Sequence, residues 1–104
     1  MFAIVWSYRA DQGRLVEFRE TYGADGVWSR LFARHPGFIA TRLYADTADE
    51  AAFITVDMWR SEEDFLEFKQ QYNEDYAEMD RRFAGLSVQQ YMGSEALSIS
   101  GVWS

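Results

Sequence analysis

The stretch FITVDMWRSEEDF (Phe53–Phe65) decides the fold, because it contains a strand, its end and the start of a helix in one run. The part AFITVDMW (Ala52–Trp59) is rich in β-branched and aromatic residues and predicts a strand. Ser61 then supplies a helix N-cap, and Asp64 suits the first turn of that helix. Asp57 does not fit this pattern, since it places a carboxylate inside an apolar strand.

Behind Ser61, apolar residues recur at steps of three and four as far as Phe83. This spacing predicts one long helix over 61–83 with an apolar face. Gly85 ends the helix, and LSVQQYM (Leu86–Met92) predicts the last strand. The apolar stripe consists of Phe65, Phe68, Tyr72, Tyr76, Met79 and Phe83.

The residues before Phe53 predict two more strands, FAIVWSY (Phe2–Tyr8) and GFIATRLY (Gly37–Tyr44). Between them, Asp11 can cap a helix that ends at Gly23, and Asp25 can cap a second, shorter helix. The resulting order predicts an α+β protein. We expect a ferredoxin-like βαββαβ sandwich, with an antiparallel sheet and the helices on one face.

Helices on one face leave the other face of the sheet open. In a sheet with one solvent-exposed face, apolar and polar residues alternate along each strand, but these strands are apolar on both sides. We therefore expect the open face to pack against a second copy of the chain in a homodimer.

The alternation of the hairpin strands predicts which residues share a face. One face is expected to carry Ile39, Thr41 and Leu43 with Ile54, Val56 and Met58. The other is expected to carry Phe38, Ala40, Arg42 and Tyr44 with Phe53, Thr55, Asp57 and Trp59. Arg42 and Asp57 would then form a structural charge pair. In the alternative interpretation, Asp57 orients or deprotonates a ligand and burial raises its pKa.

Composition narrows the class of function. The 104 residues suit one domain, and an aromatic content of 17% is enough for a core together with a cavity or an interface. The net charge of −7 argues against binding to nucleic acid. With no cysteine and a single histidine, His35, a metal site is not expected. No membrane span or secretory signal is visible, so a cytoplasmic protein is expected.

Aromatic residues predict a ligand pocket at the seam between sheet and helices. Trp59 ends the third strand at this seam, and Trp28, Tyr72 and Tyr76 can converge on it. Such walls suit a flat aromatic or quinone-like ligand, although each residue taken singly also suits a core. His35 lies in the tight connection RHPGF, where it is expected to cap the loop, with an acid–base role left open.

Two stretches carry a resemblance to a known family. VEFRETYGADGVWSRLFARHPGFIATRLYAD and FITVDMWRSEEDFLEF resemble the antibiotic biosynthesis monooxygenase family of the dimeric α+β barrel superfamily, over about Phe2–Met92. The most diagnostic elements are PGF at the second strand and the pattern at the joint between strand and helix, formed by Asp57, Trp59, Ser61 and Phe65.

The resemblance implies a domain over 1–94 whose sheet packs on that of its mate to close a dimeric α+β barrel, and a tail over 95–104 whose contact with the partner stays open. It also implies a pocket between sheet and helices. Quinone-forming members oxidise a phenol with molecular oxygen without flavin, haem or metal, because a deprotonated and desolvated phenol can itself reduce oxygen. The resemblance therefore implies a cofactor-independent monooxygenase acting on a small aromatic or polyketide-like phenol.

Residue by residue, Trp59 matches a family active-site position, and Tyr72 is a further catalytic candidate by its place on the helix. Asp57 is the third catalytic candidate. The candidate substrate-binding residues are Trp28, Tyr76, Arg42 and His35. Haem degradation is disfavoured, because relatives with that activity use a histidine on the second long helix and an asparagine on the first strand. Here Ser61–Phe83 contains no histidine, and the only asparagine, Asn73, lies on the wrong element. A non-catalytic dimeric ligand-binding protein and an isomerase or cyclase remain the alternatives.

Overall fold

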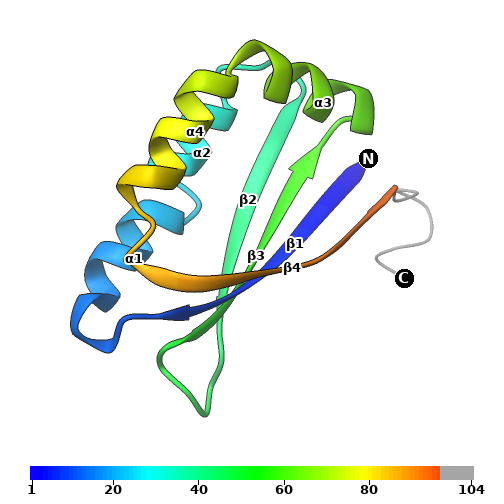
Figure 1. Ribbon diagram of the computed structural model, residues 1–104. Helices are drawn as coiled ribbons and strands as arrows, with labels where there is room; N and C mark the ends of the chain where they lie inside the picture. The colour runs from blue at the N-terminus through cyan, green and yellow to red at the C-terminus, as the bar shows by residue number, and fades with distance from the viewer. Residues whose placement is uncertain (97–104) are drawn as a thin grey trace.

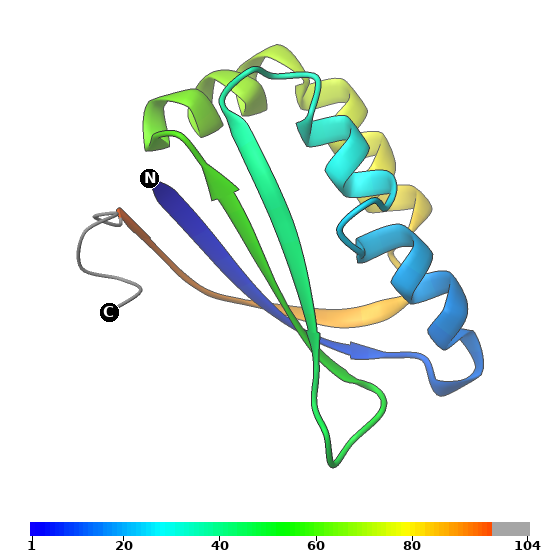
Figure 2. The ribbon, with the colours of Figure 1, turned by 180° about the vertical axis from the view of Figure 1, so that it is seen from behind.

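The computed structural model of the chain describes residues 1–96. These residues form a four-stranded antiparallel sheet whose helices cover one face (Figures 1 and 2). The fold confirms the predicted ferredoxin-like α+β architecture. The elements are β1 (Phe2–Ala10), the 3₁₀ helix η1 (Gln12–Arg14), α1 (Leu15–Tyr22), α2 (Val27–Phe32), β2 (Phe38–Ala45), β3 (Ala52–Trp59), α3 (Glu62–Gln71), α4 (Asn73–Arg82) and β4 (Ser87–Ala96).

The strands lie in the order β2-β3-β1-β4, so β1 and β3 form the centre of the sheet. Because side chains alternate along a strand, every second residue of these two strands faces the helices. Phe2 lies opposite Trp59, and Tyr8 lies opposite Phe53. All four are buried in a core whose other members are Ile4, Ala10, Phe18, Tyr22, Trp28, Leu31, Phe32, Phe68 and Leu86. Burying a large apolar side chain contributes roughly 1.5–3 kcal/mol, so this aromatic layer is what holds the helices on the sheet.

The first helical segment begins as predicted, whereas α2 does not. Asp11 accepts a hydrogen bond from the backbone N–H of Gly13, which caps η1. The backbone of α1 ends at Gly23. A hydrogen bond from the Gly26 N–H to the Gly23 carbonyl, 2.9 Å long, then closes a turn, and α2 begins after Gly26 without a side-chain cap. The predicted cap at Asp25 is therefore wrong.

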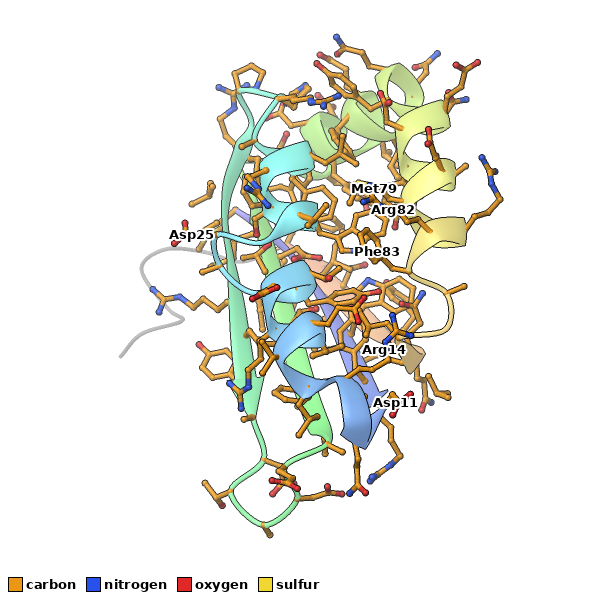
Figure 3. All side chains as sticks on the ribbon, turned by 90° about the vertical axis from the view of Figure 1, so that its left-hand side faces the viewer. Asp11, Arg14, Asp25, Met79, Arg82 and Phe83 are labelled. Atoms are coloured by element: carbon orange, nitrogen blue, oxygen red, sulfur yellow. The ribbon has the colours of Figure 1, made fainter. Side chains whose placement is uncertain are left out.

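The long helix predicted over 61–83 is divided into α3 and α4. The break lies at Tyr72, whose φ of −116° and ψ of 28° are outside the helical region. The apolar stripe still faces the core on both sides of the break. Met79 and Phe83 pack against the core from the side where α4 passes α1 and α2 (Figure 3).

The division lets the two helices cover different parts of the core. Phe68 of α3 packs on Trp59, with 5.1 Å between ring centroids. Tyr76 of α4 instead packs on Trp28 of α2, at 4.9 Å. Figure 1 shows that α3 and α4 run in different directions over the sheet. A straight helix has one direction, so the chain bends between these two contacts.

A bulge at Ile39 changes the faces of β2. Phe38 pairs with Trp59, but the next paired residue, Ala40, lies opposite Met58. Ile39 is therefore an extra residue with no partner on β3. An extra residue turns every later side chain of the strand to the opposite face.

After this bulge, Thr41 lies opposite Asp57, and Arg42 lies opposite Val56 on the other face of the sheet. The predicted pair of Arg42 and Asp57 is therefore wrong. The predicted assignment of faces is correct at Phe38 and fails from Ala40 onward. Arg42 is exposed on the open face.

The last strand is longer than the predicted Leu86–Met92, because β4 continues to Ala96, opposite Phe2. A second bulge divides β4, since Val5 pairs with Gly93 while Trp6 pairs with Tyr91. The predicted tail over 95–104 thus begins within the sheet, and its residues from 97 onward lie outside the described part of the chain.

Candidate active site

Asp57 lies on the helix-facing side of β3, with Ile4 of β1 on one side and Thr41 of β2 on the other. Its side chain is buried, with 8% of the residue exposed. Thr41 Oγ1 donates a hydrogen bond of 2.7 Å to Asp57 Oδ1. Among residues 1–96 no cationic side chain forms an ion pair with it. Burial therefore raises the pKa of Asp57 from 3.8 to about 6, although the Thr41 hydrogen bond opposes the rise.

A small cavity of about 30 Å³ lies against Asp57, and we call it the inner cavity. Its volume is enough for about one water molecule. Trp6 and Tyr8 of β1, Trp28 of α2 and Tyr76 of α4 form aromatic walls around it. The inner cavity is thus a narrow aromatic space with two carboxyl groups, Asp57 and Asp80, in its lining.

A second cavity of about 230 Å³, the outer cavity, lies between β1, β4 and α3. The outer cavity shares four lining residues with the inner cavity: Trp6, Phe32, Asp57 and Tyr76. Leu66 and Tyr91 also line the outer cavity and are exposed, by 56% and 52% respectively. The two cavities thus lie against the same residues, Asp57 among them, and we refer to them together as the cleft.

The cleft contains hydrogen-bonding groups that remain neutral. Burial raises the pKa of both Tyr8 and Tyr76, so their hydroxyl groups stay protonated. Tyr8 accepts a hydrogen bond of 3.2 Å from Thr55, whereas the Tyr76 hydroxyl has no partner among the described residues.

The indole of Trp28 is the other free donor. Its Nε1 is buried and makes no hydrogen bond to any residue in the described range. The Tyr22 hydroxyl interacts with this indole but does not meet it in hydrogen-bonding geometry. The Trp59 Nε1 is also buried without a partner in the described range, but it lines neither cavity, so of these two donors only the Trp28 N–H is placed to stabilise a ligand oxygen.

Trp59 and Tyr72 line neither cavity. Trp59 is completely buried, and the aromatic rings around it leave no space for a ligand. Tyr72 packs on Phe68, with 5.3 Å between ring centroids, at the break between α3 and α4. The structure therefore places the pocket around Asp57, two residues before the tryptophan beside which it was predicted.

His35 fixes the turn before β2. Its Nδ1 accepts a hydrogen bond of 2.9 Å from the Gly37 N–H, so the ring proton lies on Nε2, which donates to Glu67 Oε1 at 3.0 Å. His35 is buried and lines neither cavity. Of the candidate substrate-binding residues, Trp28 and Tyr76 meet at the inner cavity, while His35 and Arg42 lie elsewhere.

Sequence reasoning missed Trp6, Tyr8 and Lys69. The strand spacing of Ile4, Trp6 and Tyr8 was the available signal for the first two, because these residues share one face. For Lys69 the signal is its rarity, since it is the only lysine of the chain. Its Nζ lies 3.7 Å from the centroid of the Tyr76 ring, and it lines the outer cavity.

Residues 1–96 contain no group of three or more His, Asp and Glu side chains that could hold a metal ion. No helix among these residues is both long and apolar enough to cross a lipid bilayer.

The model of the family described as "Antibiotic biosynthesis monooxygenase" matches residues 1–78 of the chain. The chain belongs to the antibiotic biosynthesis monooxygenase family. This confirms the resemblance found in the sequence. The match ends within α4, so β4, which contributes Tyr91 to the outer cavity, lies beyond it.

Solved structures of several other proteins share the fold. A mutant of SnoaB, a cofactor-independent oxygenase from Streptomyces nogalater, is similar with a TM-score of 0.72 and 18% identity, covering 92% of this chain and 91% of that one. A putative antibiotic biosynthesis monooxygenase from Bordetella bronchiseptica is similar with a TM-score of 0.69 and 18% identity, covering 94% and 97%. One from Nitrosomonas europaea has a TM-score of 0.66 and 13% identity, covering 93% and 98%. No curated protein matches the sequence.

Proposed function

We propose that this antibiotic biosynthesis monooxygenase uses molecular oxygen to oxidise a small phenol in the cleft around Asp57, without an added cofactor. The observation that carries the proposal is the environment of Asp57. A buried carboxyl group with no cationic partner and a pKa of about 6 is suited to accept a proton near neutral pH. A carboxyl group that served only the fold would gain stability from a cation, and none pairs with this one among the described residues.

The chemistry begins with transfer of the phenol proton to Asp57. The resulting phenolate is electron-rich and reduces oxygen directly. One oxygen atom forms a new carbon–oxygen bond on the ring, and the other leaves as water with the two hydrogens that the substrate loses. The overall reaction is phenol plus O₂ to quinone plus water. All the electrons come from the substrate, so no separate reductant is required.

The walls of the cleft favour this reaction in two ways. Apolar and aromatic side chains exclude water, which strengthens each electrostatic interaction inside. The protonated Tyr76 hydroxyl and the Trp28 N–H are free donors that can stabilise negative charge on a substrate oxygen. The outer cavity of about 230 Å³ is smaller than the roughly 300–1,000 Å³ of typical ligand pockets, which favours a ligand with few rings.

The relatives support the reaction class. SnoaB is named as a cofactor-independent oxygenase, and its fold matches over 91% of its length. At 18% identity this likeness shows the fold alone, so the activity comes to this chain only as part of the proposal.

We also propose that the protein is a homodimer in which the open faces of two sheets pack together. Tyr44 and Ile54, which lie opposite each other on this face, are exposed by 52% and 44%, and Val88 of β4 is exposed by 77%. Large apolar side chains gathered on one face of a sheet are typical of an interface. A second copy would remove them from water.

One observation favours a second candidate, a non-catalytic ligand-binding protein. Trp59 occupies the position that matches a family active-site residue, yet it is enclosed in the core and lines neither cavity. A member that kept the cleft and lost the reaction would have this arrangement. An isomerase or cyclase would use the same Asp57 proton transfer without consuming oxygen.

Oxygen consumption separates these functions. The purified protein is incubated aerobically with naphthols, anthrones and hydroquinones while dissolved oxygen is recorded. We expect uptake with quinone formation, reduced by about 100-fold or more in Asp57→Asn because a positioned base is lost. Asp25→Asn is the matched control, since Asp25 is exposed on the loop before α2 (Figure 3). Tight binding without uptake would identify a binding protein, and conversion without uptake would identify an isomerase.

A further inference from the structure

Lys69 is the only cationic side chain among the residues that line either cavity. It is also the only lysine in a chain whose other basic residues are arginines. Lys69 lines the outer cavity but not the inner one, whereas Asp57 lines both. The cleft thus has one cation, on its outer side, and two carboxyl groups, Asp57 and Asp80, farther in.

The Lys69 ammonium has no charged partner at close range. It forms no ion pair and no hydrogen bond with any residue of the described range, and it lies over the face of the Tyr76 ring, 3.7 Å from the ring centroid. A cation over an aromatic ring is attracted by the ring electrons, so this contact holds Nζ at the cleft wall. Burial lowers the pKa of Lys69, while Asp80 on α4 acts on it in the opposite direction at longer range.

Other charged groups around the cleft do not cancel this cation. Glu62 lines the outer cavity from the same helix, but it is exposed, and solvent screens its charge. Asp80 lines the inner cavity and does not approach Lys69 within ion-pair distance. A partly desolvated ammonium beside apolar walls therefore retains the capacity to bind an anionic group of a ligand.

We propose that Lys69 selects aromatic substrates that carry a carboxylate. The ammonium binds the carboxylate on the outer side of the cleft, while the aromatic ring lies between Trp6, Phe32 and Tyr76 and its hydroxyl group is directed toward Asp57. The position of the hydroxyl group rests on the proposed function. The selection by Lys69 is a statement about binding and is tested without turnover.

Binding is measured by calorimetry in the absence of oxygen with 2-naphthol and with 6-hydroxy-2-naphthoic acid, which adds a carboxylate at the end of the same ring system opposite the hydroxyl group. We expect the wild-type protein to bind the acid at least about tenfold more tightly, because a charge-assisted hydrogen bond forms only with the acid. Lys69→Met keeps the length of the side chain and removes the charge. The ratio of the affinity for the acid to the affinity for the naphthol, which we call the preference, is therefore expected to fall to about one. Lys69→Arg is expected to keep most of it.

Arg34→Met is the matched control. Arg34 also lies over a tyrosine ring, that of Tyr72, at 6.0 Å, but it lines neither cavity. Removing this charge is expected to leave the preference unchanged. A preference lost equally in both variants would mean that only the net charge of the protein matters, and this would overturn the proposal.

A spectroscopic measurement tests the contact directly. Reductive methylation with ¹³C-formaldehyde keeps the positive charge and labels Lys69 as the only side-chain amine, with the α-amino group as an internal reference. Addition of 2-naphthoic acid, which has no hydroxyl group to oxidise, is expected to shift the Lys69 signal and raise its pKa. No change in either would overturn the proposal. Oxygen uptake that fails while the shift is present would reject the monooxygenase and leave the Lys69 site in place.

Discussion

Thr41 donates its hydroxyl hydrogen to Asp57 across the pair of β2 and β3, with 2.7 Å between Thr41 Oγ1 and Asp57 Oδ1. This is the only hydrogen bond of the Asp57 carboxyl group within residues 1–96. A single neutral donor compensates only part of the free energy lost when a charged carboxylate leaves water. The pair therefore positions the carboxyl group without fully stabilising its charge.

The first prediction concerns stability and pH. The pKa of Asp57 is about 6 in the folded protein and 3.8 as its ordinary value, so the folded state holds a proton that the unfolded state releases between these two values. Stability contributed by this group therefore falls as pH rises through that window. The rise in pKa from 3.8 to about 6 corresponds to about 3 kcal/mol of stability from the protonation of Asp57. This contribution is fully present below pH 3.8 and is lost once the pH is above the pKa of the folded protein.

Asp57→Asn removes this titration. Measured by urea unfolding, the free energy of unfolding of the variant relative to wild type is expected to increase by about 2.5 kcal/mol between pH 4 and pH 7.5. Asp25→Asn, at an exposed position, is expected to show no such change. A difference between wild type and Asp57→Asn that is independent of pH would contradict the raised pKa.

The second prediction concerns the hydrogen bond itself. Thr41→Val keeps the shape of the side chain and removes the donor, so the pKa of Asp57 is expected to rise by about 1 or more, since such a bond to a charged group contributes about 1.5–3 kcal/mol. The measurement is the acidic limb of the pH profile of oxygen uptake, which moves to higher pH. Thr21→Val is the control, because the Thr21 hydroxyl is also buried but donates to the Glu17 carbonyl. An unchanged limb would exclude Asp57 as the base.

The third prediction separates the tryptophan of the core from that of the cleft. Trp59→Phe is expected to lower the free energy of unfolding by about 1–3 kcal/mol, because it leaves a void among packed rings, while ligand affinity stays within about twofold. Trp28→Phe removes a wall and a free donor of the inner cavity, so ligand affinity is expected to fall by about tenfold. Calorimetry with 1-naphthol checks both. A tenfold loss of affinity in Trp59→Phe with no loss in Trp28→Phe would mean that the ligand binds beside Trp59.

The fourth prediction concerns the joint between β2 and α3. A Cβ atom on Gly37 would lie 2.5 Å from the Cβ of Asp64, whereas a Cβ on Gly85 meets no atom within 4 Å. Gly37→Ala is therefore expected to destabilise the protein by about 1–3 kcal/mol. Gly85→Ala is expected to be tolerated. Thermal unfolding of the two variants at one pH checks the comparison, and equal melting temperatures would contradict it.

The fifth prediction concerns the open face of the sheet. If two sheets pack together, Ile54→Lys places a charge within the interface and is expected to give a monomer of 12.1 kDa in light scattering. Val16→Lys is the control, because Val16 is exposed by 72% on α1, away from the sheet. A wild-type protein that is itself monomeric at micromolar concentration would refute the dimer.

Most of the fold could be predicted because its signals are local. In Phe53–Phe65 the strand, the cap at Ser61 and the start of the helix follow one another, and Ser61 does accept the hydrogen bond from the Asp64 N–H. The helical spacing also placed Trp28 and Tyr76 correctly on the core side, where they meet. These features depend on neighbours within a few residues, which a sequence displays.

The bulge at Ile39 could not be predicted in the same way. Nothing in GFIATRLY distinguishes an extra residue, because the bulge depends on how β2 fits beside β3. One residue of offset was enough to give Asp57 the hydroxyl of Thr41 in place of the guanidinium of Arg42. The prediction of one helix over 61–83 was wrong at Tyr72 for a related reason. The direction of each helix is set by packing across the core, which the spacing of apolar residues does not show.

The sheet ends on both sides in an interrupted strand. Ile39 in β2 and Met92 in β4 are each an extra residue in an outer strand, so neither border offers a long regular row of backbone groups. A regular border is a template on which further chains can add and extend into fibres, and an irregular one resists such growth. The same distortions that bring Thr41 and Tyr91 to the cleft therefore help the protein to stay dispersed when it is concentrated.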